Sequence, residues 1–287
     1  FYLNRNPGID LAADRLEIGV CAQHNNGGID VDLWWRSSIA GLFPVGEAAG
    51  AHGVARPGGA ALNSAQVGAT RAAQWIAARE QGAARADEGW QELAGDALQK
   101  ARSLLEAACG REESSGVLID DVLMESTRAM SDNAGLVRSR QGLEELARNV
   151  AEWRRRVVDE CVVDPTSRRS VDRLFLVRDI LDVQAVYVAA MLDHLDHGVG
   201  SRGSVLYTDP DGDLPVSWWN DGADLDVEEI FRHRLDSKAH HGVTQRVSVD
   251  AVGEAIHAHW GPVRPIPTED EFLENVWKTY RVDHNIH

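Results

Sequence analysis

One carboxylate, Glu47, stands in a setting where a polar side chain could take part in chemistry. It directly follows a short apolar run at residues 41–46. Such a run, bounded by glycine, predicts a short buried strand. Open α/β sheets bind their ligands at the carboxyl ends of strands. The sequence therefore places Glu47 at a candidate binding edge.

A glycine-rich loop follows this carboxylate and leads into a predicted helix over residues 60–78. The loop glycines, Gly50, Gly53, Gly58 and Gly59, let backbone approach a flat or anionic group closely. The free N–H groups and positive dipole end of the helix would point at whatever occupies the loop. An electron-rich ring or a phosphate would fit there. The alternative is a glycine-rich connection that binds nothing, since such a loop is weak evidence by itself.

The predicted helix after the loop carries small side chains at helical spacing. This spacing predicts that the helix packs very close to a neighbour. The small residues are Ala61, Ser64, Ala65, Gly68 and Ala72.

Residues 83–200 show the apolar periodicity of a helical bundle. The predicted helices cover residues 90–108, 116–130, 141–158 and 170–197. In the last of these, one face forms a stripe that we expect to be buried. The stripe consists of Leu174, Val177, Leu181, Gln184, Val188 and Met191.

Residues 201–287 are less regular and rich in turn signals. Helices are predicted near residues 227–237 and 269–280. The tail is therefore expected to be irregular and rich in helix.

Charge and composition exclude several classes of function. The 287 residues include 45 Asp and Glu against 29 Lys and Arg, for a formal charge of −16. This argues against a nucleic-acid partner and an anionic membrane surface. No apolar run approaches the ~18 residues of a membrane span. Three isolated cysteines, Cys21, Cys109 and Cys161, predict no disulfide framework, zinc site or iron–sulfur cluster held by this chain alone, and a reducing, cytoplasmic setting.

The histidines form a weaker set of candidates. His194 and His197 lie three residues apart beside two aspartates, a spacing that can bind metal. A solvated helix end is the interpretation that we favour, and we predict no metal site. The pair His240-His241 has no convincing acidic partner close in the sequence.

The residues around Glu47 resemble the flavoprotein family of succinate dehydrogenase and fumarate reductase, which includes L-aspartate oxidase. That family carries H-x-x-x-G-G-I, then S-x-x-G-L-[FY]-x-x-G-E, then H-G-A-N-R-x-G-G-N-S-L. The corresponding strings here, in the same order, are His24-Asn25-Asn26-Gly27-Gly28-Ile29, Ser38-Ile39-Ala40-Gly41-Leu42-Phe43-Pro44-Val45-Gly46-Glu47 and His52-Gly53-Val54-Ala55-Arg56-Pro57-Gly58-Gly59-Ala60-Ala61-Leu62.

Two shorter strings extend the resemblance. Gly135-Leu136-Val137-Arg138-Ser139 is similar to a helix start of the family, and Ser201-Arg202-Gly203-Ser204 is similar to its E-S-R-G-[SA]-H turn.

The resemblance implies FAD as the cofactor and assigns residues to it. Glu47 would accept hydrogen bonds from ribityl or ribose hydroxyls. The backbone N–H groups of Ala61 and Leu62 would face the flavin pyrimidine. The remaining cofactor-binding positions are the glycines Gly46, Gly58 and Gly59.

The resemblance also implies a substrate site. Arg56 would grip a substrate carboxylate, which suits a guanidinium fork. The family histidine aligns with Gln23, so either Gln23 takes its role or a shift of one residue lets His24 serve. His52 matches a family histidine. In this chain His52 either acts directly in catalysis or packs behind the loop. The family's Asn-Ser pair is Ala60-Ala61 here, which implies a smaller, less polar site.

No strand–turn–helix unit with G-x-G-x-x-G opens the chain, so the resemblance implies the C-terminal part of a longer FAD-dependent oxidoreductase. The expected fold is an α/β fragment, the C-terminal part of a Rossmann-like FAD-binding domain, with a helical bundle and an irregular tail. The expected segments are 1–30, the end of a capping domain; 31–82, the FAD-binding part; 83–200, the helical domain; and 201–287, the tail.

Such a protein would move a hydride between flavin and a small carboxylated substrate. The resemblance is also compatible with a homo-oligomer and with an electron-transfer partner subunit. This chain alone would be inactive. The alternatives are a non-catalytic helical assembly module with a vestigial flavin edge, and an L-aspartate oxidase-like enzyme.

Overall fold

The computed structural model describes residues 2–10, 12–15, 27–50, 59–79, 89–112, 116–203, 205–216, 226–250, 255–263, 268 and 270–283. The chain divides into two compact units, Phe1–Gln81 and Gly82–His287. Helices and three two-stranded sheets make it a mixed α and β structure.

The described elements of the first unit are short except for one helix. They are α1 (Tyr2–Arg5), the 3-10 helix η1 (Gly46–Ala49) and α2 (Ala60–Arg79). The helix predicted over residues 60–78 is confirmed as α2.

The strand predicted over residues 41–46 is wrong. Residues 42–45 are irregular, and η1 begins at Gly46. A strand needs a neighbouring strand, and no described segment pairs with this one. Its hydrogen bonds are local instead, since the Leu42 carbonyl accepts the Ser37 N–H at 3.0 Å.

Close packing against α2 is confirmed at Gly68, where a Cβ would lie 2.7 Å from the Trp35 ring. The neighbouring Trp34 ring stacks on Trp75 with centroids 5.6 Å apart, and the Arg71 guanidinium lies 4.2 Å above Trp34. A helix of small residues thus accepts two bulky rings from the segment before it.

The second unit is built around three long helices. Its elements are α3 (Trp90–Cys109), β1 (Val117–Leu118), α4 (Ile119–Ala134), β2 (Val137–Arg138), α5 (Arg140–Asp159), β3 (Cys161–Val162), α6 (Arg168–Asp196), β4 (Leu206–Asp213), η2 (Glu229–Phe231), β5 (Val243–Val249), β6 (Ile256–Pro262) and α7 (Phe272–Asp283).

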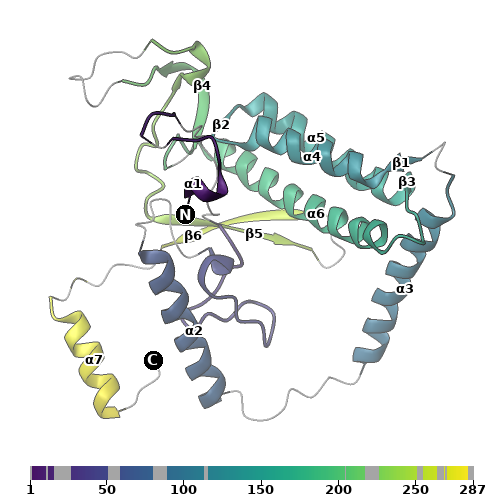
Figure 1. Ribbon diagram of the computed structural model, residues 1–287. Coiled ribbons are helices and arrows are strands. Elements are labelled where there is room, and N and C mark those ends of the chain that lie inside the picture. The colour runs from purple at the N-terminus through teal and green to yellow at the C-terminus, as the bar shows by residue number, and fades with distance from the viewer. Residues whose placement is uncertain are drawn as a thin grey trace. The chain divides into compact units, whose positions relative to one another are not determined.

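The core of this unit lies between α4, α5 and α6, which run alongside one another in Figure 1. The stripe predicted on the last helix is buried at Leu174, Val177, Leu181, Gln184 and Val188, and Met191 packs at its edge. Side-chain hydroxyls cap two of the helices: Ser139 accepts the Gly142 N–H at 3.0 Å, and Ser167 accepts the Ser170 N–H at 3.3 Å.

Short sheets surround the core. β1 pairs with β3 and β2 with β4 in parallel, while β5 and β6 form an antiparallel hairpin in register from Val243 and Pro262 to Val249 and Ile256. The hairpin contacts α6, beside which it lies in Figure 1.

The irregular, helix-rich tail predicted for residues 201–287 is wrong in part, because the strands β4, β5 and β6 form there. The helix predicted near residues 227–237 is also wrong. Only the 3-10 turn η2 forms, and the chain then extends. His233 bridges to Thr208 and Asp213, and Leu235 bridges to Ser201. Pairing with distant backbone therefore overrides the local helical pattern.

Candidate functional site

Two backbone segments, residues 27–29 and residues 48–50, lie against each other beside Glu47. The Ile29 N–H donates to the Ala48 carbonyl at 2.8 Å. A Cβ on Gly28 would lie 2.4 Å from the Gly50 nitrogen, and a Cβ on Gly50 would lie 2.2 Å from the Gly28 nitrogen. Only glycine allows this approach, so Gly28 and Gly50 hold the first motif string against the turn that follows Glu47.

Glu47 is held on η1, which packs against the first turns of α2. Gly46 has φ of 62°, and a Cβ there would lie 3.0 Å from the Ala65 Cβ. Gly50 ends the turn with φ of 61°, and its N–H donates to the Glu47 carbonyl at 2.9 Å. The Glu47 side chain is exposed.

The N-terminus of α2 supplies hydrogen-bond donors to the same region. The Asn63 N–H donates to the Gly59 carbonyl at 3.4 Å, so Gly59 is the N-cap residue that precedes α2. By helix geometry, the N–H groups of Ala60, Ala61 and Leu62 have no acceptor within the helix. Leu62 is 73% exposed, and a Cβ on Gly59 would meet nothing within 4 Å.

These features suit a cofactor with a flat, electron-rich ring and a polyol chain. The backbone N–H groups at the N-terminus of α2 and its positive dipole end can face the oxygens and nitrogens of the ring. The Glu47 carboxylate can accept hydrogen bonds from hydroxyls of the polyol chain. The open space at Gly59 lets the cofactor approach the backbone. Glu47, Gly59, Ala61 and Leu62 could therefore hold FAD. The other predicted site residues, Gln23, His24, His52, Arg56 and Gly58, lie outside the described residues.

A second group of polar and aromatic side chains lies at the end of α6, where the sequence predicted a solvated helix end. His194 and His197 lie against the Trp260 ring, with centroids 5.3 and 4.9 Å away. His240 lies 6.0 Å from the same ring. We call His194, His197, His240 and Trp260 the Trp260 cluster. No short sequence pattern joins these residues, because three separate elements supply them.

The sequence also missed the acidic partner of the histidine pair. Asp236 is almost fully buried; its Oδ1 lies 3.1 Å from His240 Nδ1, and its Oδ2 lies 3.5 Å from His241 Nε2 and 3.6 Å from Arg202. Burial acts to raise the pKa of Asp236, but the His240 hydrogen bond and the Arg202 charge hold that pKa below its ordinary value. Asp236 therefore remains an anion in mildly acidic solution.

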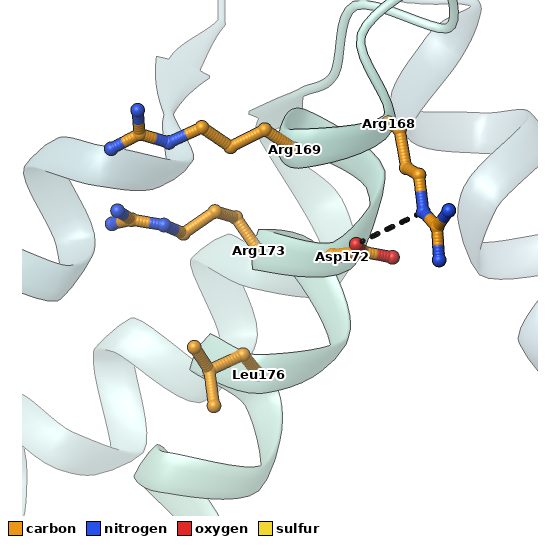
Figure 2. A pocket seen from close by; sticks show the side chains of 5 residues that line it. All are labelled: Arg168, Arg169, Asp172, Arg173 and Leu176. Carbon is orange, nitrogen blue, oxygen red and sulfur yellow. Dashed lines mark ion pairs between the residues drawn. The ribbon is translucent and has the colours of Figure 1, made fainter.

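The first turns of α6 carry three arginines that line an open hollow (Figure 2). Figure 2 shows Arg169 and Arg173 extending to the same side, while Arg168 points away and pairs with Asp172 at 3.6 Å. Arg173 is paired with Asp120 at 2.7 Å. Ion pairs of this kind at the surface contribute little to the free energy of folding, and we assign no function to these arginines.

The described residues contain neither a metal-binding cluster nor a membrane-spanning helix. In that part of the chain, His, Cys, Asp and Glu side chains do not gather in any group of three or more that could hold a metal ion. Within the same residues, no helix is both long and apolar enough to span a membrane.

Comparison with known proteins gives one local sequence match. No protein-family model matches the chain. Over 66 residues, or 23% of this chain, the sequence is 39% identical to a subunit of the fumarate reductase (CoM/CoB) of Methanothermobacter marburgensis, and the match covers 12% of that relative.

Solved structures extend the likeness to most of the fold. A mutant of the E. coli quinol fumarate reductase FrdA superposes with a TM-score of 0.62 at 19% identity, covering 86% of this chain and 38% of that one. The apo Mycobacterium smegmatis Sdh1 complex gives a TM-score of 0.57 at 19% identity, covering 91% of this chain and 40% of that one.

The resemblance to fumarate reductase and succinate dehydrogenase flavoproteins is thereby confirmed. The sequence match is local, and the likeness to the solved structures shows the fold. The chain spans 38 to 40% of the length of those solved chains.

Proposed function

We propose that this chain is the C-terminal portion of an FAD-dependent oxidoreductase of the fumarate reductase and succinate dehydrogenase type. The observation that carries the proposal is the convergence of Gly28, Gly50, Glu47 and the N-terminus of α2. The local likeness to a fumarate reductase supports it. When bound, FAD would supply the ring that accepts and donates hydride.

The residues of this chain would bind and orient that cofactor. Glu47 accepts hydrogen bonds from cofactor hydroxyls. Ala61 and Leu62 donate their backbone N–H groups to the ring, where the positive helix end stabilises negative charge. Gly58 and Gly59 leave room for the ring to approach backbone, while Gly46 lets η1, which carries Glu47, pack against Ala65 of α2. In this proposal residues 31–82 are the C-terminal part of a Rossmann-like FAD-binding domain, residues 1–30 the end of a capping domain, residues 83–200 the helical domain and residues 201–287 the C-terminal tail.

The substrate is a small carboxylate. Arg56 binds it through a bidentate guanidinium fork, and Gln23 or His24, together with His52, completes the site. The formal charge of −16 makes a local cation necessary for an anionic substrate, and Arg56 supplies it. A homo-oligomer, a cytoplasmic location and an electron-transfer partner subunit belong to the same proposal.

Arg56→Lys tests the substrate assignment in the product of the complete gene. Lysine keeps the charge but loses the fork. Because a hydrogen bond to a charged group contributes about 1.5–3 kcal/mol, we expect kcat/KM for fumarate reduction to fall about tenfold or more, with FAD content unchanged. The measurement is dye-linked steady-state kinetics with fumarate and, separately, L-aspartate.

Arg128→Lys, at an exposed position on α4, is the matched control and should keep native kinetics. Native kinetics in Arg56→Lys would contradict the assignment of Arg56. Oxidation of L-aspartate in preference to turnover of fumarate would replace the proposed substrate with the L-aspartate oxidase alternative.

A further inference from the structure

A short loop, residues 32–36, lies along one face of α2. The Trp35 indole lies against Gly68, and the three atoms nearest to a Cβ built on Gly68 all belong to that indole, at 2.7 to 2.8 Å. Further along the helix, Arg71 Nε donates to a carbonyl of the loop at 2.9 Å. Trp75 stacks against another ring of the loop with centroids 5.6 Å apart. The loop therefore contacts α2 over successive turns.

Trp35 is held in a backbone conformation that bulky residues rarely adopt. Its φ is 62°, in the left-handed region. Asp32 fixes this conformation, because its Oδ1 accepts the N–H groups of Trp34 and Arg36 at 2.8 and 3.0 Å. Asp32 Oδ2 accepts from Arg36 Nε at 2.6 Å. The loop thus keeps an unfavourable backbone conformation at the residue whose ring lies on Gly68.

The same helix contacts η1 one turn before Gly68. A Cβ on Gly46 would lie 3.0 Å from the Ala65 Cβ, and Gly68 is about 4.5 Å further along the helix axis. In the proposed function, the backbone N–H groups of Ala61 and Leu62 at the start of this helix face the flavin. A contact with η1 alone would let α2 pivot about Ala65, and the ring on Gly68 removes that freedom.

We propose that Trp35 is a positioning residue, which fixes α2 through Gly68 and so sets where the N–H groups of Ala61 and Leu62 stand relative to Glu47 and the flavin. This inference rests on the proposed function, because it concerns the site at which FAD would bind. Trp35 acts through α2, so its effect reaches the cofactor by way of the helix position.

The position of α2 determines how strongly it stabilises a reduced ring. The positive helix end and its free N–H groups favour negative charge, and reduction of the flavin adds negative charge near N1 and C2=O. Displacing the start of the helix would therefore weaken FAD binding and make the midpoint potential of the bound flavin more negative. A side chain that only stabilises the fold would leave the potential of bound flavin unchanged.

Trp35→Ala in the product of the complete gene tests the role of the ring. We expect FAD affinity to fall about five- to tenfold, as the loss of one hydrogen bond implies, and the midpoint potential to become more negative. Trp35→Phe keeps a flat ring and should restore most of both values. Fluorescence titration with FAD measures the affinity, and reductive titration beside a reference dye measures the potential. The matched control is Trp90→Ala on α3, a 50% exposed position in the second unit, which should keep both native values.

Gly68→Ala tests the same contact from the side of α2. The added methyl group would meet the indole, so this substitution alone should also weaken FAD binding and make the potential more negative. In the Trp35→Ala background the ring atoms that the methyl group meets are gone. Gly68→Ala should then have little further effect, so the two substitutions should be strongly non-additive.

A native midpoint potential in Trp35→Ala and in Gly68→Ala would overturn the inference, and so would additive effects of the two substitutions. If Trp35→Ala does not fold, Gly68→Ala alone decides, because a native potential in that variant would show that the contact does not position α2. A native protein that takes up no FAD would instead contradict the proposed function, so the two failures are distinguishable.

Discussion

Gly28 is the residue on which the shape of the candidate site depends most directly. Its backbone lies against that of Gly50, and the contact brings the first motif string onto the turn that carries Glu47. The sequence predicted that glycines allow close approach in the loop after Glu47. It could not show that the partner of Gly50 is a glycine more than twenty residues earlier.

Gly28→Ala should separate these two segments, because the added Cβ would lie 2.4 Å from the Gly50 nitrogen. Overpacking of this kind costs about 1–3 kcal/mol. We therefore expect faster limited proteolysis within residues 27–50, measured by mass spectrometry. The adjacent Gly27→Ala is the control, because a Cβ there meets nothing within 4 Å. Equal cleavage of the two variants would show that this contact does not shape the segment.

At the scale of elements, the sequence patterns that predicted the structure correctly are long and periodic. The bundle helices α3, α4, α5 and α6 appear where apolar periodicity predicts them, since each buries one face against its neighbours. The patterns that failed are short. The predicted strand at residues 41–46 has no neighbour among the described residues, and the predicted helix near 227–237 gives way to pairing with β4.

Leu181→Ala tests whether the stripe on α6 forms the core of the second unit. Leu181 is fully buried, so its truncation should lower the free energy of unfolding by about 2–5 kcal/mol. Leu176→Ala on the same helix removes a side chain that is 51% exposed and should change it by no more than about 0.5 kcal/mol. Chemical denaturation followed by circular dichroism measures both values. Similar losses in the two variants would refute the assignment of the buried face.

At the scale of the whole molecule, the order of the motifs carried more information than any single element. Three strings in family order predicted the resemblance that the comparisons confirm, although the sequence match to a fumarate reductase subunit covers 66 residues and no protein-family model matches. The Trp260 cluster could not be predicted in this way, because its residues are brought together only by the packing of the hairpin on α6.

The central claim is that this chain contributes part of an FAD site. The most direct measurement is the FAD retained per polypeptide, from visible absorbance, in the product of the complete gene and in the variants Glu47→Ala and Glu145→Ala. Glu145 is an exposed carboxylate on α5 and serves as the charge-matched control. We expect the native protein and Glu145→Ala to be yellow. Glu47→Ala should bind FAD about tenfold or more weakly, since a hydrogen bond to a charged group contributes about 1.5–3 kcal/mol. A colourless native protein that takes up no added FAD, or a Glu47→Ala variant with native affinity, would contradict the account.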